Sequence, residues 1–172
     1  MSTRFSPSSH TRIWEHLNDL DDDIQSLLNP VDPPDPEPSD LPRCRGVITT
    51  NKAMSSGDST INGWTEQYNV GSGWNASTGI FTVPAGQAGL YTVGLTVSFG
   101  SDSTRRLIFI EGDAGALLAR VEGPASGYSQ MCVATEVQLT AGQTLRPRCY
   151  CTSAASIRGD QSPASFFVRR VL

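Results

Sequence analysis

Residues that could carry out acid-base or nucleophilic chemistry are few in this 172-residue chain. The two histidines, His10 and His16, lie six positions apart, so they would not share one face of a helix. No histidine follows them, which excludes Ser-His-Asp and Cys-His catalysis from the rest of the chain. The sequence therefore predicts no nucleophilic active site.

Two carboxylate pairs, Asp58 with Glu66 and Glu111 with Asp113, have the residue types of a glycosidase acid and base. Pairs of this kind occur in any β-rich protein, so we predict that the chain is not an enzyme. The four cysteines lack metal-ligand spacing, and we expect reduced, buried thiols and neither a metal site nor a cofactor. They are Cys44, Cys132, Cys149 and Cys151.

The elements that would position such residues fall into two parts of opposite charge. Residues 1–42 carry nine acidic and two basic side chains, whereas residues 43–172 carry eight acidic and eleven basic ones. No apolar run is long enough to span a membrane, and the N-terminus lacks the pattern of a secretory signal. We expect no membrane insertion and no export by the usual route.

The first part predicts a helix over residues 1–29, ending before Pro30. Its apolar residues are spaced four and three apart, as in the seam of a coiled coil. A helix with only about two heptads is marginal in isolation, so it needs a partner. Self-association, docking on another protein and packing against its own domain all remain open. The seam residues are Ile13, Leu17, Leu20, Ile24 and Leu27.

A proline-rich linker is predicted over residues 30–42, where six of thirteen residues are proline and four are acidic. Proline fixes φ and removes amide donors, so this stretch should form an extended spacer. It would separate the helix from the following domain.

Short alternating segments with Gly, Ser, Asn and Thr between them fill residues 43–172 and predict an all-β antiparallel sandwich of the jelly-roll type. Residues 90–99 alternate most clearly, with Tyr91, Val93 and Phe99 on an apolar face. Residues 135–148 predict a hairpin that turns at Ala141. The expected strands cover residues 46–50, 64–70, 80–83, 90–99, 105–111, 117–122, 128–139, 144–152 and 165–172.

Three stretches of this domain carry a family pattern. They are WNASTGIFTVP at residues 74–84 followed by Gly-Leu-Tyr at 89–91, the segment Leu139-x-x-Gly142-x-x-Leu145, and the closing Ser165-Phe-Phe-Val. In this order they resemble the globular-head family of complement C1q, which is related to the tumour necrosis factor jelly roll. The resemblance covers about residues 45–172.

The resemblance implies a compact homotrimer, with the first and last strands near the threefold axis. Apolar residues of the matching stretches would then lie in the core of the head or at the subunit interface. These residues are Phe81, Tyr91, Val93, Phe166 and Phe167. Related heads sometimes bind calcium, for which Asp102 and Asp113 are candidate ligands.

The chain departs from animal members of the family, because it has no collagen repeat and only a helix and a spacer before the head. The same jelly roll occurs in bacteriophage virion proteins, whose trimeric heads sit on short attachment elements. We therefore expect a non-enzymatic virion protein that contacts other virion proteins through its arm, assembled in the host cytoplasm.

The place of such a protein on the particle stays open. A minor tail or tail-tip protein in host-surface binding, a capsid decoration or head-fibre protein, and a free trimeric ligand or lectin-like protein all fit the layout. Host cell-surface glycans are a candidate partner. The arginines of the head lack the interleaved aromatic residues of a nucleic-acid surface, so we expect no nucleic-acid binding.

Overall fold

The computed structural model describes residues 41–100, 105–124, 127–160 and 162–171, all of which belong to one compact unit, Ser39–Leu172. We call this unit the head. The predicted helix at residues 1–29, and nearly all of the predicted linker, lie outside the described residues. No helix within these ranges is long and apolar enough to cross a membrane.

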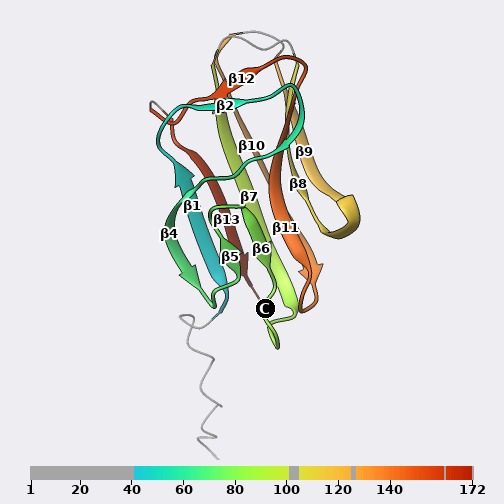
Figure 1. Cartoon of the computed structure of the whole chain (residues 1–172). Coiled ribbons are helices and arrows are strands. Elements are labelled where there is room, and N and C mark those ends of the chain that lie inside the picture. Colours follow the sequence, from blue (N-terminus) through green and yellow to red (C-terminus); the bar gives the residue numbers. More distant parts are fainter. Residues whose placement is uncertain (1–40, 101–104, 125–126, 161, 172) are drawn as a thin grey trace, which may run out of the picture. The chain divides into compact units, whose positions relative to one another are not determined.

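The head is an all-β sandwich of two antiparallel sheets, as predicted (Figure 1). The first sheet has the order β2-β12-β7-β13-β1-β4, and β10 pairs with the free side of β7. Its strands are β1 (Arg43–Ile48), β2 (Lys52–Met54), β4 (Thr65–Val70), β7 (Gly89–Phe99), β10 (Ser129–Leu139), β12 (Ala155–Ile157) and β13 (Ala164–Arg170).

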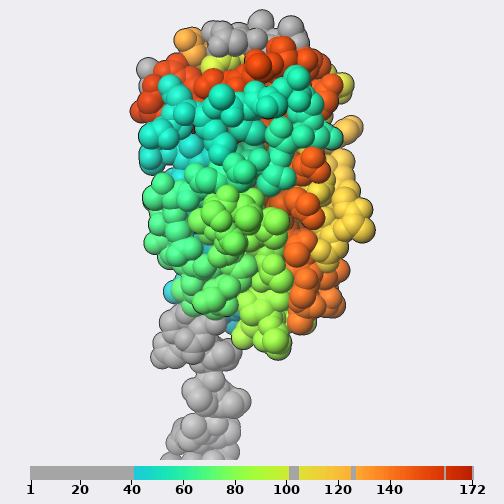
Figure 2. All heavy atoms as spheres, in the orientation of Figure 1, coloured from blue at the N-terminus to red at the C-terminus, as the bar shows by residue number. Residues whose placement is uncertain are grey.

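The second sheet has the order β5-β6-β11-β8-β9, and β3 also pairs with β11. Part of it is visible in the space-filling view, which shows β11 in orange and, toward the sheet edge beyond β8, β9 in yellow (Figure 2). Its strands are β3 (Gly57–Thr60), β5 (Trp74–Asn75), β6 (Ile80–Thr82), β8 (Arg106–Glu111), β9 (Leu117–Gly123) and β11 (Thr144–Cys151), and the short 3-10 turn η1 (Asp113–Gly115) joins β8 to β9.

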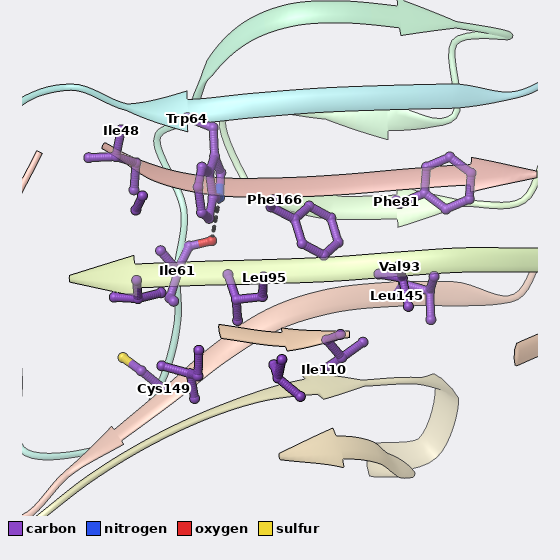
Figure 3. Close-up of a cluster of buried hydrophobic side chains, with 14 of the residues drawn as sticks. Ile48, Ile61, Trp64, Phe81, Val93, Leu95, Ile110, Leu145, Cys149 and Phe166 are labelled. Atoms are coloured by element: carbon purple, nitrogen blue, oxygen red, sulfur yellow. Dashed lines mark hydrogen bonds between the residues drawn. The ribbon is translucent and has the colours of Figure 1, made fainter. Parts of the chain in front are cut away.

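Strand β7 supplies much of the core because five of its apolar residues alternate along it and point between the sheets. Tyr91, Val93, Leu95, Val97 and Phe99 are each at most 1% exposed, as the alternation of the sequence predicts. Figure 3 shows this layer facing residues of the second sheet. The core is therefore formed by both sheets.

An aromatic cluster fills one side of the core. The rings of Trp64, Trp74 and Phe166 lie 6.1 to 6.4 Å apart in tilted arrangements that aromatic pairs favour. Gly46 of β1 leaves room for them, since a Cβ atom there would lie 1.8 Å from Cη2 of Trp74. The Trp64 indole also donates a 2.7 Å hydrogen bond to the carbonyl of Ile61 (Figure 3).

The prediction of a hairpin over residues 135–148 is wrong. Strand β10 pairs with β7 in the first sheet, whereas β11 pairs with β8, β6 and β3 in the second. Leu139 and Leu145 do lie in the core, as predicted, at 4% and 0% exposure. The turn at Ala141 therefore carries the chain from one sheet to the other, because both strands bury apolar residues in the space between the sheets.

Strand β13 lies between β7 and β1 in the first sheet, so it is a central strand. At the end of β13, the backbone amide of Arg170 donates a 2.9 Å hydrogen bond to the carbonyl of Pro42. The start of β1 and the end of β13 lie at one end of the head, and β2 and β12 lie at the other (Figure 1).

Candidate binding surfaces

The residues proposed for catalysis or metal binding do not form a site in the described part of the chain. Asp58 lies on β3 of the second sheet and Glu66 on β4 of the first. His10, His16 and Asp102 lie outside the described residues. Within those residues, no three His, Cys, Asp or Glu side chains are grouped as metal ligands.

The outward side of the first sheet is the first of two candidate surfaces, and we call it the interface face. Paired strands place its residues in rows that run from β1 through β13 and β7 to β10. The three rows are Arg43, Arg169, Thr92 and Glu136; Arg45, Phe167, Gly94 and Ala134; and Val47, Ser165, Thr96 and Cys132.

The centre of the interface face combines one aromatic ring with small residues. The Phe167 ring lies across Gly94, where a Cβ atom would come within 2.3 Å of it. Ala134 and Cys132 follow on β10 and are exposed in the single chain. The small side chains of Ala134 and Cys132 allow another chain to approach closely on the β10 side.

Charges on the interface face are segregated. Arg43, Arg45 and Arg169 lie on the β1 and β13 side, and Glu136 lies on the β10 side. A surface that is positive on one side and negative on the other fits a second copy placed head to tail, so that unlike charges meet.

Of the five residues that the sequence analysis assigned to the core or the subunit interface, four lie in the core and one lies on the interface face. Phe81, Tyr91, Val93 and Phe166 are fully buried between the sheets. Phe81 and Tyr91 pack with their ring centroids 5.8 Å apart. Phe167 instead lies on the interface face, because its position in β13 alternates with those of Phe166 and Val168.

The outward side of the second sheet holds the other candidate surface, a groove of about 350 Å³. We call it the outer groove. Its rows run from β3 through β11 and β8 to β9. They are Asp58, Tyr150, Leu107 and Glu122; Thr60, Arg148, Phe109 and Arg120; and, without β3, Arg146, Glu111 and Leu117.

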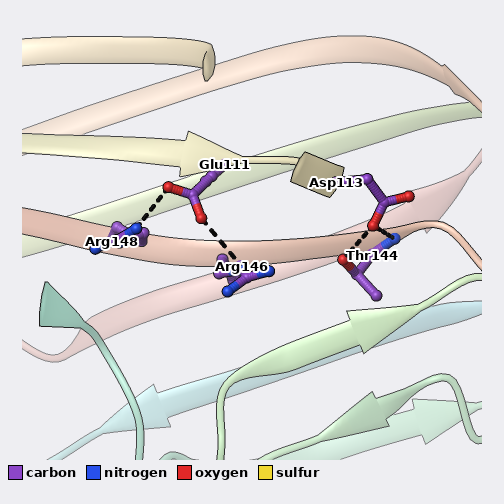
Figure 4. A network of polar contacts seen from close by, with 5 residues as sticks. All are labelled: Glu111, Asp113, Thr144, Arg146 and Arg148. Atoms are coloured by element: carbon purple, nitrogen blue, oxygen red, sulfur yellow. Dashed lines mark hydrogen bonds and ion pairs between the residues drawn. The ribbon is translucent and has the colours of Figure 1, made fainter. Parts of the chain in front are cut away.

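One end of the outer groove is fixed by a polar network (Figure 4). The Arg148 guanidinium donates to Glu111 at 2.6 Å, and Nε of Arg146 lies 3.4 Å from the other oxygen of the same carboxylate as an ion pair. Nearby, Asp113 accepts hydrogen bonds of 2.9 and 2.5 Å from the amide and hydroxyl of Thr144. Because Glu111 is only 7% exposed, these contacts should be rigid and stronger than surface ion pairs.

The arginines of the head are not all on the surface. Arg106 is completely buried at the sheet interior, where it donates to the Gly127 carbonyl at 2.7 Å and to the Ser129 hydroxyl at 2.9 Å. Its guanidinium lies 5.7 Å from the centre of the Phe99 ring. The neighbouring Arg105 is exposed and pairs with Glu122 at 2.7 Å, which lowers the pKa of that carboxyl.

A wider groove of about 890 Å³ follows the β5–β6 hairpin, which contains the family pattern. Its lining has no charged side chain, and the pattern itself serves to form the turn. Oδ1 of Asn75 accepts from the amides of Ser77 and Thr78, and Gly79 takes a φ of 74°. This stretch is structural.

No family model and no curated protein matches this sequence. Solved structures do match the head. The globular domain of zebrafish complement 1qA protein has a TM-score of 0.56 at 11% identity, covering 76% of this chain and 98% of that one. Murine APRIL at pH 8.5 has a TM-score of 0.58 at 16% identity, covering 75% and 99%.

The head has the C1q/TNF-like jelly-roll fold. At these identities the likeness establishes the fold, which is the one that the sequence resemblance implied. The outer groove has no counterpart in the sequence pattern, because its residues come from four separate strands. Only the alternation of Arg146, Arg148 and Tyr150 on β11 signals an outward polar row.

Three of the four cysteines of this jelly-roll head are buried, namely Cys44, Cys149 and Cys151, whereas Cys132 is exposed on the interface face. All four are free thiols. Burial raises the pKa of the Cys44 thiol to about 12. The hydrogen bond between Cys149 and Cys151 raises the pKa of the former and lowers that of the latter.

We expect a thiol reagent to leave Cys44, Cys149 and Cys151 unmodified in the folded protein, because the reagent cannot reach them. Mass spectrometry after a brief reaction at neutral pH should therefore find at most one modified cysteine per chain. In denaturant, all four should react. Modification of any buried thiol at the rate seen in denaturant would contradict this arrangement of the core.

Proposed function

We propose that this chain is a non-enzymatic bacteriophage virion protein whose C1q/TNF-like heads form a homotrimer that projects from the particle. In this proposal residues 1–29 bind other virion proteins and residues 30–42 act as a spacer. The protein acts as a minor tail or tail-tip protein that contacts the host surface. The order of a predicted helix, a predicted acidic spacer and a jelly-roll head supports the virion role.

The proposed trimer is supported by the composition of the interface face. The small residues Gly94 and Ala134 are adjacent at its centre, and its two sides carry opposite charge. Glu136 of one copy can meet Arg43, Arg45 or Arg169 of the next around a ring. A head-to-tail contact of this kind forms a cyclic oligomer when the rotation between copies closes. The number of three rests on the resemblance to C1q heads.

The position of the first described strand supports outward projection. The start of β1 lies at one end of the head, so a chain attached through its N-terminal part leaves the end with β2 and β12 free (Figure 1). The second sheet also stays open when the interface face is covered. Both regions are therefore available for contact with a host surface.

The decisive experiment is to locate the protein in an imaged virion. Density of threefold symmetry at the tail tip would support host attachment, whereas density on the capsid would support the decoration or head-fibre role. A protein absent from particles but trimeric in solution would instead be a free ligand or lectin-like protein. Binding of the purified full chain to host cells then tests adhesion directly.

Removal of residues 1–29 is expected to abolish incorporation into virions and to leave the head folded. The seam residues Ile13, Leu17, Leu20, Ile24 and Leu27 are then lost, whereas the head keeps its core. Incorporation is measured by immunoblotting purified particles, and folding by circular dichroism. Normal incorporation of the shortened chain would show that the arm is not the anchor.

A further inference from the structure

The outer groove has an apolar floor with polar groups at its margins. Leu107 and Phe109 of β8 face outward, next to Tyr150 and Arg148 of β11. Adjacent strands lie roughly 4.8 Å apart, so the four strands from β3 to β9 span roughly 14 Å. The Arg148 guanidinium lies over the Phe109 ring, 5.6 Å from its centre, and the Arg105 guanidinium lies over the Tyr150 ring at 6.0 Å. The floor therefore combines aromatic side chains with the guanidinium groups stacked on them.

Two charged side chains at opposite margins have no salt bridge within the described residues. Asp58 on β3 and Arg120 on β9 are both exposed, and neither forms a side-chain hydrogen bond there. The other charges along the groove are engaged, Glu111 with two arginines and Glu122 with Arg105. Asp58 can accept hydrogen bonds from a ligand, and Arg120 can donate them.

We propose that the outer groove binds a saccharide. A sugar ring has an apolar face that packs on aromatic rings and hydroxyls around its edge that both donate and accept. The parts of Phe109 and Tyr150 that line the groove beside these guanidinium groups match the apolar face, and Asp58 and Arg120 match the hydroxyls. This inference rests on the proposed function, for which it names the ligand class and the site of host contact.

Other ligand classes fit the outer groove less well. A phosphate group or nucleic acid would need several free cations, but Arg105, Arg146 and Arg148 are already paired with carboxylates. A peptide strand would need a free sheet edge, whereas the floor lies on the face of a sheet. The polar network holds one end of the groove in place, which lowers the entropy cost of binding.

The location of the outer groove is compatible with the proposed trimer. It lies on the second sheet, and the interface face lies on the first. Covering the interface face therefore leaves one groove open on each copy. Several weak saccharide sites on one assembly bind a multivalent surface far more tightly than one site does.

The test is saturation-transfer NMR on the full chain with three soluble probes at millimolar concentration, namely maltotriose, chitotriose and tri-galacturonic acid. They represent neutral hexoses, N-acetylhexosamines and uronic acids. We expect at least one to bind. Asp58→Asn and Arg120→Gln should each weaken that binding at least about tenfold, since each removes one charged partner of the hydroxyls.

Glu66→Gln is the matched control, because Glu66 is exposed on the first sheet and far from the groove in the fold. It should leave binding unchanged. All variants should keep the circular dichroism and mass of the parent. Absence of binding by all three probes, or binding that survives both groove substitutions, overturns the proposal.

Failure of the saccharide site can be told apart from failure of the proposed function. If the full chain binds host cells and the groove variants bind equally well, attachment stands and the outer groove is not its site. If the probes bind at the groove but the chain does not bind host cells, the saccharide site stands and host attachment fails.

Discussion

Ala134→Arg is expected to prevent the proposed trimer from forming and to leave single chains. Ala134 lies at the centre of the interface face, opposite Gly94, on which the Phe167 ring lies. An arginine there would place a long, charged side chain where a second copy must approach closely, and its burial without a partner is costly. In the single chain this position is exposed, so folding should not change.

The variant is made in the chain lacking residues 1–29, so that the predicted helix cannot hold copies together. Light scattering should then report the mass of one chain for the variant and three times that mass for the parent. Ala141→Arg is the matched control, because Ala141 is exposed in a turn outside the interface face. It should remain trimeric.

Cys132 provides an independent readout of the same contact. It lies one row from Ala134 on the interface face, next to Thr96. Its thiol should react slowly in the parent and at least about tenfold faster in Ala134→Arg, because dissociation uncovers it. A variant that keeps the trimeric mass and the slow Cys132 reaction would show that the copies do not meet through this face.

Gly46→Ala is expected to destabilise the head by roughly 3 kcal/mol and lower its melting temperature by roughly 10 °C. The added methyl group would lie 1.8 Å from Cη2 and 2.6 Å from Cζ3 of Trp74. Trp74 cannot simply move away, since Trp64 and Phe166 pack against it. The clash must be relieved by displacing β1 or the aromatic cluster.

Gly112→Ala is the matched control for this substitution. Its backbone has a φ of −94°, and an added Cβ would meet only Leu118, at 3.4 Å and beyond. Differential scanning calorimetry should therefore find its melting temperature close to that of the parent. Equal melting temperatures for Gly46→Ala and the parent would mean that Trp74 does not occupy the space above β1.

The sequence predicted the longer strands because each has a clear apolar alternation. The alternation of Tyr91, Val93 and Leu95 in β7 corresponds directly to burial. The short strands β2, β3, β5 and β12 were not predicted, since two to four residues are too few to show a period. They form because each pairs with another strand: β3 with the longer β11, β5 with β6, and β2 with β12.

Local patterns could not predict which sheet a strand joins. Ala141 and Gly142 form a tight turn whether the strands on either side pair with each other or separate into two sheets. The choice depends on β7 and β8, which are distant in sequence. For the same reason the outer groove was not predicted, because Asp58 and Tyr150 become neighbours only through the pairing of β3 with β11.

The central place of β13 has a consequence for synthesis. During translation β1 and β7 emerge early, but the strand that separates them, Ala164–Arg170, is made more than sixty residues after β7 ends. Until β13 is made, the edges of β1 and β7 that it will pair with stay unpaired in the nascent chain. Unpaired edges of apolar strands promote aggregation and chaperone binding. A chain interrupted before Ala164 cannot complete the interface face, so unfinished chains should be excluded from assembly.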